Sequence, residues 1–322
     1  MCTAITLQSL QREAFLGRTM DFSYEIDPHL FIVPSEYTWT NSLNDRRVYD
    51  YCSFIGIGQE LDGMQGFFDG VNEYGFAAAT LFFAGYAQYS LKPCKDKELV
   101  ASSDFLHYIL GRCTSIEDLL KVLKNVCIIG IPDPITQAIA PLHWIATDTS
   151  GRCVTIECTK KGLVVSNNYI GVMSNSPDFE WHMTNLRNYM EVSPMQTKEA
   201  KWANITLTPF GQAGGTVPLP GGYTSPERFV RTAYLKTHIP TPFDCTESIT
   251  SGFHIMDNVS IPEGAVITDR ETYDYTKYTA FINTNTCTYF YKTYEDIRIH
   301  TASLSQDSTP STGMVDLGRL AS

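Results

Sequence analysis

Short apolar runs with the spacing of β-strands occur in blocks along this chain, and helical segments separate the blocks. Strand-like runs lie at 2–7, 14–22, 30–34, 52–58 and 76–83, then at 142–148, 153–158 and 162–167, and again near 279–283, 288–294 and 297–302. Helical patterns follow Ser115, whose spacing to Asp118 resembles a capping box, and return at 178–190 and 226–238. This pattern predicts an α+β fold without regular βαβ alternation.

The first two runs predict a β-hairpin. CTAITL (2–7) and AFLGRTMDF (14–22) are joined by a polar turn around Ser9–Glu13. No Pro- or Ser-rich linker divides the 322 residues and no internal repeat is apparent, so we expect one domain over 2–302. The segment 303–322 is rich in Ser and Thr and weakly patterned, which predicts a weakly ordered C-terminal tail.

Composition and charge narrow the classes of function. Apolar residues make up 43% of the chain and charged residues 18%, as in folded globular proteins. A formal net charge of −11 repels phosphate backbones, so no nucleic-acid partner is expected. No stretch approaches the roughly 20 apolar residues of a membrane helix, and the N-terminus lacks a basic start followed by an apolar core. We therefore expect a cytoplasmic protein with no membrane partner.

The nine cysteines are scattered and odd in number, which, without a secretory signal, predicts reduced and mostly buried thiols. No CxxC pair is present. Cys153 and Cys158 lie in one strand-like run, where alternation places their side chains on opposite faces. A zinc site is therefore not expected, and no metal is assigned.

Several common catalytic motifs are missing. The sequence has no GxSxG elbow, no HExxH and no phosphate-binding loop. Its Gly-rich stretch 211–222 lacks a following Lys-Ser/Thr and is typical of a tight surface or active-site loop. The histidines, among them His143 and His182, adjoin aromatic residues and are interpreted as core or surface residues.

Cys2 is the residue that suggests chemistry. Methionine is usually removed when the second residue is small, which would make Cys2 the amino-terminal residue. An α-amino group titrates at about 7.7–8.0, close to working pH, so it can act as the base for the thiol of the same residue. Taken alone, however, a cysteine at this position is more often only a second residue, and a nucleophile needs partners.

Arg18 and Asp21, in GRTMD (17–21), supply candidate partners because they lie one short hairpin away. A guanidinium stabilises a thiolate electrostatically, and a carboxylate can hold an α-amine in place. The alternative interpretation is an exposed ion pair near a strand end, which would contribute little.

Longer stretches occur in a specific order: MCTAITL, GRTMDF, DGVNEYGFAAATLFFAGYA, APLHWIATDTSG, GVMSNSPDFEWHMTNLRNY, LTPFGQAGGTVPLPGGYTSPERFVR, and a segment from IPEGAV to YDYTKYTAF. Together they resemble the choloylglycine hydrolase family of N-terminal-nucleophile hydrolases, which comprises bile salt hydrolases and penicillin V acylases. The resemblance runs from Met1 to about Ala302. It implies a four-layer αββα sandwich, with two antiparallel sheets between helical layers, and it suggests a homotetramer.

Carried over by position, the resemblance implies that Cys2 is the nucleophile and that its α-amine is the base. Arg18 and Asp21 fall where the family supports the thiol and the amine. Asn175 matches the amide of the oxyanion hole, and Arg228 matches the last arginine of the catalytic site. Without the resemblance, Asn175 is a turn residue before Ser-Pro and Arg228 is a solvated helix charge.

Phe82 departs from part of the family, since its position is typically Asn in bile salt hydrolases and Tyr in penicillin V acylases. Only the backbone N–H at this position is needed for the oxyanion, so the departure concerns the pocket. An aromatic ring without a polar group suits an aryl acyl group better than a hydrogen-bonded steroid edge. We therefore expect Phe82 to bind substrate.

The sequence thus predicts an amidohydrolase that acts on the linear amide C–N bond of a small-molecule acyl amide, without a cofactor. A penicillin V acylase-like activity is favoured. Conjugated bile salt (choloylglycine) hydrolysis is the alternative, and a non-catalytic binding protein on the same fold is a further one.

Overall fold

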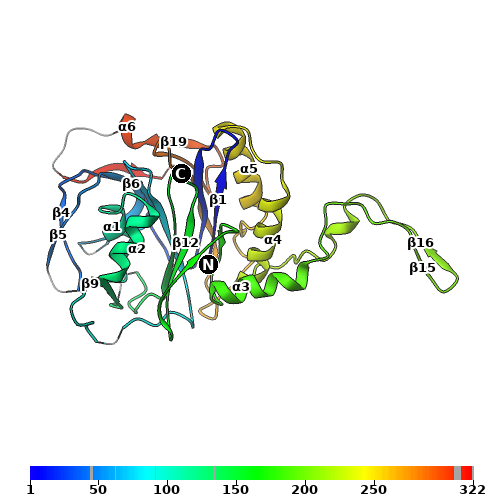
Figure 1. Cartoon of the computed structure of the whole chain (residues 1–322), viewed down its shortest axis with the longest axis horizontal. Coiled ribbons are helices and arrows are strands. Elements are labelled where there is room, and N and C mark those ends of the chain that lie inside the picture. The colour runs from blue at the N-terminus through cyan, green and yellow to red at the C-terminus, as the bar shows by residue number, and fades with distance from the viewer. Residues whose placement is uncertain (44–45, 62, 91, 133–134, 308–312, 321–322) are drawn as a thin grey trace.

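The computed structural model describes residues 1–43, 46–61, 63–90, 92–132, 135–307 and 313–320. Two large β-sheets lie face to face, and helices cover the outer face of each sheet (Figure 1). One apolar cluster fills the space between the sheets. Of two further clusters, one lies between the larger sheet and its helices and the other between the smaller sheet and its helices. The predicted αββα sandwich is therefore confirmed.

The smaller sheet contains the N-terminal hairpin. Its strands follow the order β14-β1-β2-β17-β18-β19, with the bounds β1 (Cys2–Gln8), β2 (Ala14–Phe22), β14 (Val172–Met173), β17 (Tyr275–Asn283), β18 (Thr288–Thr293) and β19 (His300–Ser303). The predicted pairing of β1 with β2 is confirmed, from Cys2↔Met20 to Gln8↔Ala14. Ala4 packs between the sheets and Ile5 packs against the helices, because neighbouring side chains of a strand point to opposite faces.

The larger sheet follows the order β13-β12-β11-β8-β7-β6-β3-β20. Its strands are β3 (His29–Val33), β6 (Phe54–Leu61), β7 (Met64–Asn72), β8 (Ala77–Phe82), β11 (Leu142–Thr147), β12 (Cys153–Thr159), β13 (Gly162–Asn167) and β20 (Val315–Arg319). On β12, Cys153 belongs to the inter-sheet core and Cys158 to the outer core, which confirms that these thiols lie on opposite faces.

The helices divide between the two outer faces. Helices α1 (Phe105–Leu110) and α2 (Ile116–Lys124) cover the larger sheet, whereas α3 (Phe179–Asn185), α4 (Ser225–His238) and α5 (Cys245–Asp257) cover the smaller one (Figure 1). The predicted cap of α2 is confirmed, since Asp118 N–H donates to Ser115 Oγ at 3.2 Å. The remaining elements are β4 (Thr38–Thr40), β5 (Arg47–Tyr49), β9 (Glu98–Ala101), β10 (Val126–Ile129), η1 (Leu186–Tyr189), β15 (Ala200–Trp202), β16 (Ile205–Leu207), η2 (Gly214–Thr216) and α6 (Leu304–Asp307).

Two predictions are corrected by the fold. The tail is not weakly ordered at 315–319, because these residues form edge strand β20, which pairs with β3 (Val315↔Ile32); positions 308–312 and 321–322 lie outside the described residues. Nor are all the thiols free. Cys94 and Cys127 are 33 positions apart but form a disulfide, because folding brings their Cα atoms to 5.9 Å.

The larger sheet opens between β7 and β8, and this opening positions the site. The two strands pair from Val71↔Ala77 to Asp69↔Ala79 and then diverge. Beyond that point β7 stays paired with β6 and β8 with β11. An apolar cavity lies in the opening, with Cys2 of the facing sheet at its wall. Among the helices of the described residues, none combines the length and apolar composition needed to cross a bilayer.

Candidate active site

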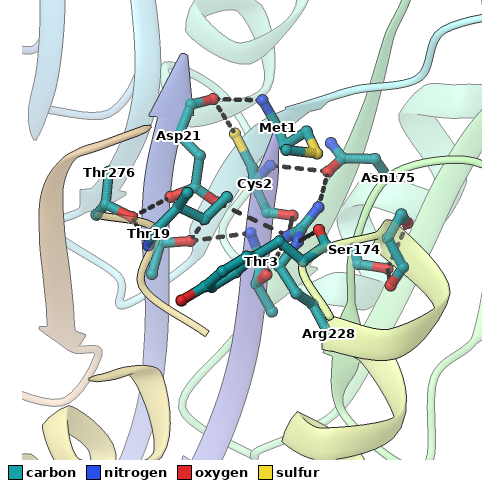
Figure 2. A network of polar contacts seen from close by, with 12 residues as sticks. Met1, Cys2, Thr3, Thr19, Asp21, Ser174, Asn175, Arg228 and Thr276 are labelled. Carbon is teal, nitrogen blue, oxygen red and sulfur yellow. Dashed lines mark hydrogen bonds and ion pairs between the residues drawn. The ribbon is translucent and has the colours of Figure 1, made fainter. Parts of the chain in front are cut away.

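Cys2 (Figure 2) is the first residue of β1, the strand between β14 and β2. The β1–β14 register pairs Ala4 with Met173, so its continuation places Cys2 opposite Asn175. The Cys2 side chain is buried in the inter-sheet core and borders the cavity. The strand pairing therefore brings two of the predicted residues together although 172 residues separate them in the chain.

Arg18 approaches the thiol from within the inter-sheet core. It is paired with Ala4 on the neighbouring strand, diagonal to Cys2, and its side chain is 1% exposed. Arg18 Nη2 lies 3.0 Å from Cys2 Sγ and 3.1 Å from the sulfur of Met20. Burial by itself disfavours the charge of Arg18, but Tyr278, Cys2 and Asp69 outweigh burial and raise the pKa of the guanidinium. A permanent cation thus faces the sulfur.

Asp21 and Arg228 lie on the opposite face of the hairpin, under the helical layer (Figure 2). The Asp21 carboxylate accepts hydrogen bonds from Thr19 Oγ1 at 3.0 Å and Thr276 Oγ1 at 2.6 Å, and it lies 3.7 Å from Arg228 Nη1. Burial raises the pKa of Asp21 and lowers that of Arg228, and each charge opposes the shift of the other. In the untrimmed chain the carboxylate thus lies against an arginine, and its contact with the α-amine of Cys2 stays a prediction, because Cys2 has no free amine while Met1 is attached.

Arg228, in the first turn of α4, ties the nucleophile strand to Asn175. Its Nη1 donates to the Cys2 carbonyl oxygen at 2.6 Å and to Thr3 Oγ1, and its Nη2 donates to Asn175 Oδ1 at 2.6 Å. Arg228 is fully buried, so the interpretation of a solvated helix charge is wrong.

The side-chain amide of Asn175 has a defined orientation. Two donors, Arg228 Nη2 and the Cys2 backbone N–H (2.8 Å), approach one of its heteroatoms, which must therefore be the oxygen. Its nitrogen then faces the Phe82 carbonyl oxygen, at 2.7 Å. Since an amide NH₂ carries two hydrogens, this group can also donate elsewhere.

Phe82, at the end of β8, contributes both backbone and side chain to the cavity. Phe83 N–H donates to the carbonyl oxygen of Pro141, the residue before β11, at 2.7 Å. Strand alternation therefore directs the Phe82 N–H to the other side, toward the opening and the Asn175 amide. The Phe82 ring lines the cavity and meets Phe22 edge-on with 6.4 Å between centroids. Phe83, in contrast, is fully buried and stacks on His143.

Met1 lies in front of the site in the untrimmed chain. Its amino group donates to the Asp21 carbonyl oxygen at 2.5 Å and to the Asp274 carboxylate at 3.2 Å. With Met1 present, the Cys2 nitrogen is an amide nitrogen and cannot act as a base. Removal of Met1 would convert it into an amine beside Sγ.

Sequence reasoning missed several residues around the site. The threonines Thr3, Thr19 and Thr276 form part of the network (Figure 2), and so does Asp274. All four lie within the stretches that carry the family resemblance, but the sequence assigned no role to them. His182 was interpreted only as a core or surface residue, yet its Nε2 lies 2.8 Å from the Asn175 carbonyl oxygen. Among the described residues, no group of His, Cys, Asp and Glu side chains is arranged to hold a metal ion.

The arrangement has the parts of a covalent amide hydrolase: a thiol beside a cation, a potential α-amine, and amide donors at the mouth of an apolar cavity. A family model for linear amide C–N hydrolases of the choloylglycine hydrolase family matches residues 2–316. The chain belongs to the choloylglycine hydrolase family. It is thus an amidohydrolase for linear amide C–N bonds, and the predicted enzyme class is confirmed.

The chain is similar to members of both branches of this family. The bile salt hydrolase/transferase of Clostridium perfringens is 32% identical over 96% of this chain and 94% of its own length. The penicillin V acylase of Pectobacterium atrosepticum is 26% identical over 86% of this chain and 73% of its own. A crystal structure of a mutant conjugated bile acid hydrolase from Clostridium perfringens superposes with a TM-score of 0.91 at 31% identity, covering 98% of this chain and 96% of that one.

Proposed function

We propose that this protein hydrolyses the amide bond of conjugated bile salts and that Cys2, freed of Met1, is the nucleophile. The main observation in support is the position of Cys2 Sγ, which lies 3.0 Å from Arg18 Nη2 and beside an apolar cavity. Relatives at 32% and 31% identity are named as a bile salt hydrolase/transferase and a conjugated bile acid hydrolase, whereas the penicillin V acylase is 26% identical, which supports bile salts over penicillin V. The penicillin V acylase-like activity that the sequence favoured therefore becomes the second candidate.

In the proposed reaction the Cys2 thiol transfers its proton to the α-amine of the same residue. The thiolate attacks the carbonyl carbon of the substrate, and a C–S bond forms while the carbonyl oxygen becomes an oxyanion. Asn175 Oδ1, 2.8 Å from the Cys2 nitrogen, would hold the amine, and Arg18 would stabilise the thiolate. The α-ammonium then protonates the leaving nitrogen, the C–N bond breaks, and water releases the acid from the acyl-enzyme.

Two N–H groups are candidates for the oxyanion hole. These are the free hydrogen of Asn175 Nδ2 and the Phe82 backbone N–H, which strand geometry directs to the same place. Both are fixed before substrate arrives, because Arg228 holds the Asn175 oxygen and β11 holds the strand that carries Phe82. Fixed donors stabilise a developing charge without reorganisation.

The apolar lining of the cavity is evidence for a substrate with an apolar acyl group. The lining includes Cys2 and the apolar side chains of Met20, Phe22, Phe68, Phe82 and Leu142. A steroid nucleus and an aryloxyacetyl group could both bury apolar surface there. The rings of Phe22 and Phe82 are the observation that keeps penicillin V as the second candidate, because flat aromatic acyl groups pack well on aromatic edges.

Parallel assays on glycocholate, taurocholate and penicillin V test the substrate, and mass spectrometry tests the nucleophile. We expect Met1 to be absent from the active protein and Cys2→Ala to abolish turnover without loss of the fold. Turnover of penicillin V alone would replace bile salts by the second candidate. Full activity with Met1 retained, or near-wild-type activity of Cys2→Ala, would exclude the mechanism.

We also infer that the protein is a homo-oligomer. The arm, defined as residues 193–219, carries the β15–β16 hairpin and projects away from the sandwich (Figure 1). It exposes large apolar side chains, including Met195, Trp202, Ile205, Phe210 and Val217. Such a surface fits a second copy of the chain, because apolar side chains of this size are normally covered. The family resemblance suggests four copies.

A further inference from the structure

A buried polar cluster that the proposed mechanism does not use lies behind Arg18. Asp69 Oδ2 accepts hydrogen bonds from Arg18 Nη1 at 3.2 Å and from the Tyr278 hydroxyl at 2.6 Å. Asp69 Oδ1 accepts from the Tyr289 hydroxyl at 2.8 Å. Asp69 and both tyrosines are at most 1% exposed. Three strands, β7, β17 and β18, supply one residue each. Asp69 begins the stretch DGVNEYGFAAATLFFAGYA and Tyr278 lies in YDYTKYTAF, but no single stretch contains the whole cluster.

The cluster fixes the orientation of the Arg18 guanidinium. Nη1 is held by Asp69 and by the Phe68 carbonyl oxygen at 3.1 Å, and Nε donates to the Thr19 carbonyl oxygen at 3.2 Å. These contacts leave Nη2 facing Cys2 Sγ. Asp69 occupies the last β7–β8 pair before the strands diverge, so the edge of the opening itself is tied to Arg18.

The same contacts decide how much positive charge the sulfur experiences. Two buried ion pairs surround the thiol, Arg18 with Asp69 and Arg228 with Asp21, so their charges cancel. A third pair, between Asp274 and the amino group of Met1, lies in front of the site. Asp69 offsets the charge of Arg18 at close range. The two tyrosine hydroxyls in turn stabilise the charge on Asp69, because burial and the adjacent carboxylate raise their pKa values and keep them protonated.

We propose that Asp69, held by Tyr278 and Tyr289, is a positioning residue that aims Arg18 at the Cys2 thiol and limits the positive charge the thiol experiences. This proposal rests on the proposed role of Cys2 as nucleophile. It predicts effects of opposite sign from two substitutions within one cluster, which loss of packing would not produce.

The first substitution is Asp69→Asn, which removes the charge and keeps the shape. Arg18 is then no longer offset, so the thiolate is favoured, and alkylation of Cys2 by iodoacetamide at pH 6 should be about three- to ten-fold faster than in the wild type. The readout is the mass of the N-terminal peptide over time in Met1-trimmed protein.

The second substitution is Tyr278→Phe, which removes a donor from the carboxylate oxygen that Arg18 also contacts. Asp69 should then bind Arg18 more strongly, and alkylation should slow by about two- to three-fold. Tyr275→Phe is the matched control, because Tyr275 lies on the same strand but its ring meets Tyr294 edge-on and faces the Lys277 ammonium. Its alkylation rate should equal that of the wild type.

Faster alkylation of Asp69→Asn together with slower alkylation of Tyr278→Phe supports the proposal. Unchanged rates, or changes of the same sign in both variants, overturn it. If Asp69→Asn does not fold, Tyr278→Phe decides alone, and only slower alkylation supports the proposal. Failure of the proposed function looks different, because Cys2→Ala would then retain turnover whatever these rates are.

Discussion

Asn175 combines two roles that a single substitution can separate. Its oxygen accepts from Arg228 and from the Cys2 nitrogen, while its nitrogen faces Phe82 and the cavity side. Asn175→Ala removes both roles and should lower kcat by about 10²- to 10³-fold, the usual loss for one oxyanion-hole donor. Asn175→Asp keeps an acceptor for Arg228 but removes the donor.

We expect Asn175→Asp to lose kcat nearly as strongly as Asn175→Ala, with KM changed much less in both. Steady-state kinetics on glycocholate measures this directly. A variant Asn175→Asp with wild-type kcat would show that the amide serves only to hold Arg228 and the Cys2 strand.

His182 makes stability depend on pH. Burial lowers its pKa to about 4, and among the described residues its Nδ1 has no hydrogen-bond partner, so a proton there would be unsatisfied. An unfolded histidine titrates near 6.5, so between these values the unfolded chain binds more protons. The free energy of unfolding should therefore fall as pH decreases from about 6.5 to about 4, with His182 contributing up to about 1.4 kcal/mol per pH unit.

The measurement for His182 is urea unfolding at several pH values for the wild type and for His182→Gln, whose amide can still donate to the Asn175 carbonyl oxygen. The variant should lose the contribution of one proton from the pH slope. His238→Gln, at an exposed position on the last turn of α4, should keep the wild-type slope. Equal slopes in all three proteins would show that His182 is protonated in the folded state.

At the end of strand β8, two neighbouring phenylalanines point in opposite directions, and we expect one to bind substrate and the other to stabilise the fold. Phe82 lines the cavity, whereas Phe83 is fully buried and stacks on His143 with 4.2 Å between ring centroids. Phe83→Ala should therefore cost about 3–5 kcal/mol of stability, as for other buried aromatic residues. Phe82→Ala should change kcat/KM for the acyl amide and cost much less stability.

Thermal unfolding and kinetics of the two variants, measured on the same preparations, compare these effects. The reverse pattern, with Phe82→Ala the more destabilised and its kcat/KM unchanged, would make Phe82 a packing residue. In that case the aromatic lining would no longer support penicillin V as the second candidate.

Elements with clear local patterns could be predicted from the sequence, and others could not. The β1–β2 hairpin has two apolar runs with a polar turn, and α2 has a capping residue and a regular apolar face. Helix α5 lacks such a pattern because Ser, Thr and Gly252 interrupt its apolar positions. Gly252 is required by tertiary packing, since a Cβ there would come within 2.6 Å of the Phe281 ring. Strand β20 exists only because β3 offers an edge.

In the candidate site, only the residues that lie in the hairpin or match the family by position could be predicted from the sequence. Cys2 and Arg18 are close because one hairpin carries both. Asp69, Tyr278 and Tyr289 meet only when β7 and β18 pack across the sandwich, and no spacing in the chain encodes that contact. The disulfide between Cys94 and Cys127 escaped prediction for the same reason.

At the scale of the whole molecule, the exposed apolar side chains of the arm predict a contact with a second copy of the chain. Trp202 and Ile205, on β15 and β16, are 72% and 64% exposed. If they dock on a second copy, Trp202→Ser combined with Ile205→Ser should shift the protein from an oligomer to a single chain in sedimentation velocity. The thermal unfolding of the sandwich itself should change little, because both side chains are largely exposed and lie on the projecting hairpin.

Tyr169→Ser is the matched control for the arm, since Tyr169 is 93% exposed but lies in the turn after β13. Its sedimentation should equal that of the wild type. A single exposed aromatic residue is common on monomers, whereas a projecting hairpin with several apolar side chains is not. A wild-type protein that sediments as one chain at every concentration would exclude a second copy as the occupant of the arm, and the exposed side chains would then require a different partner.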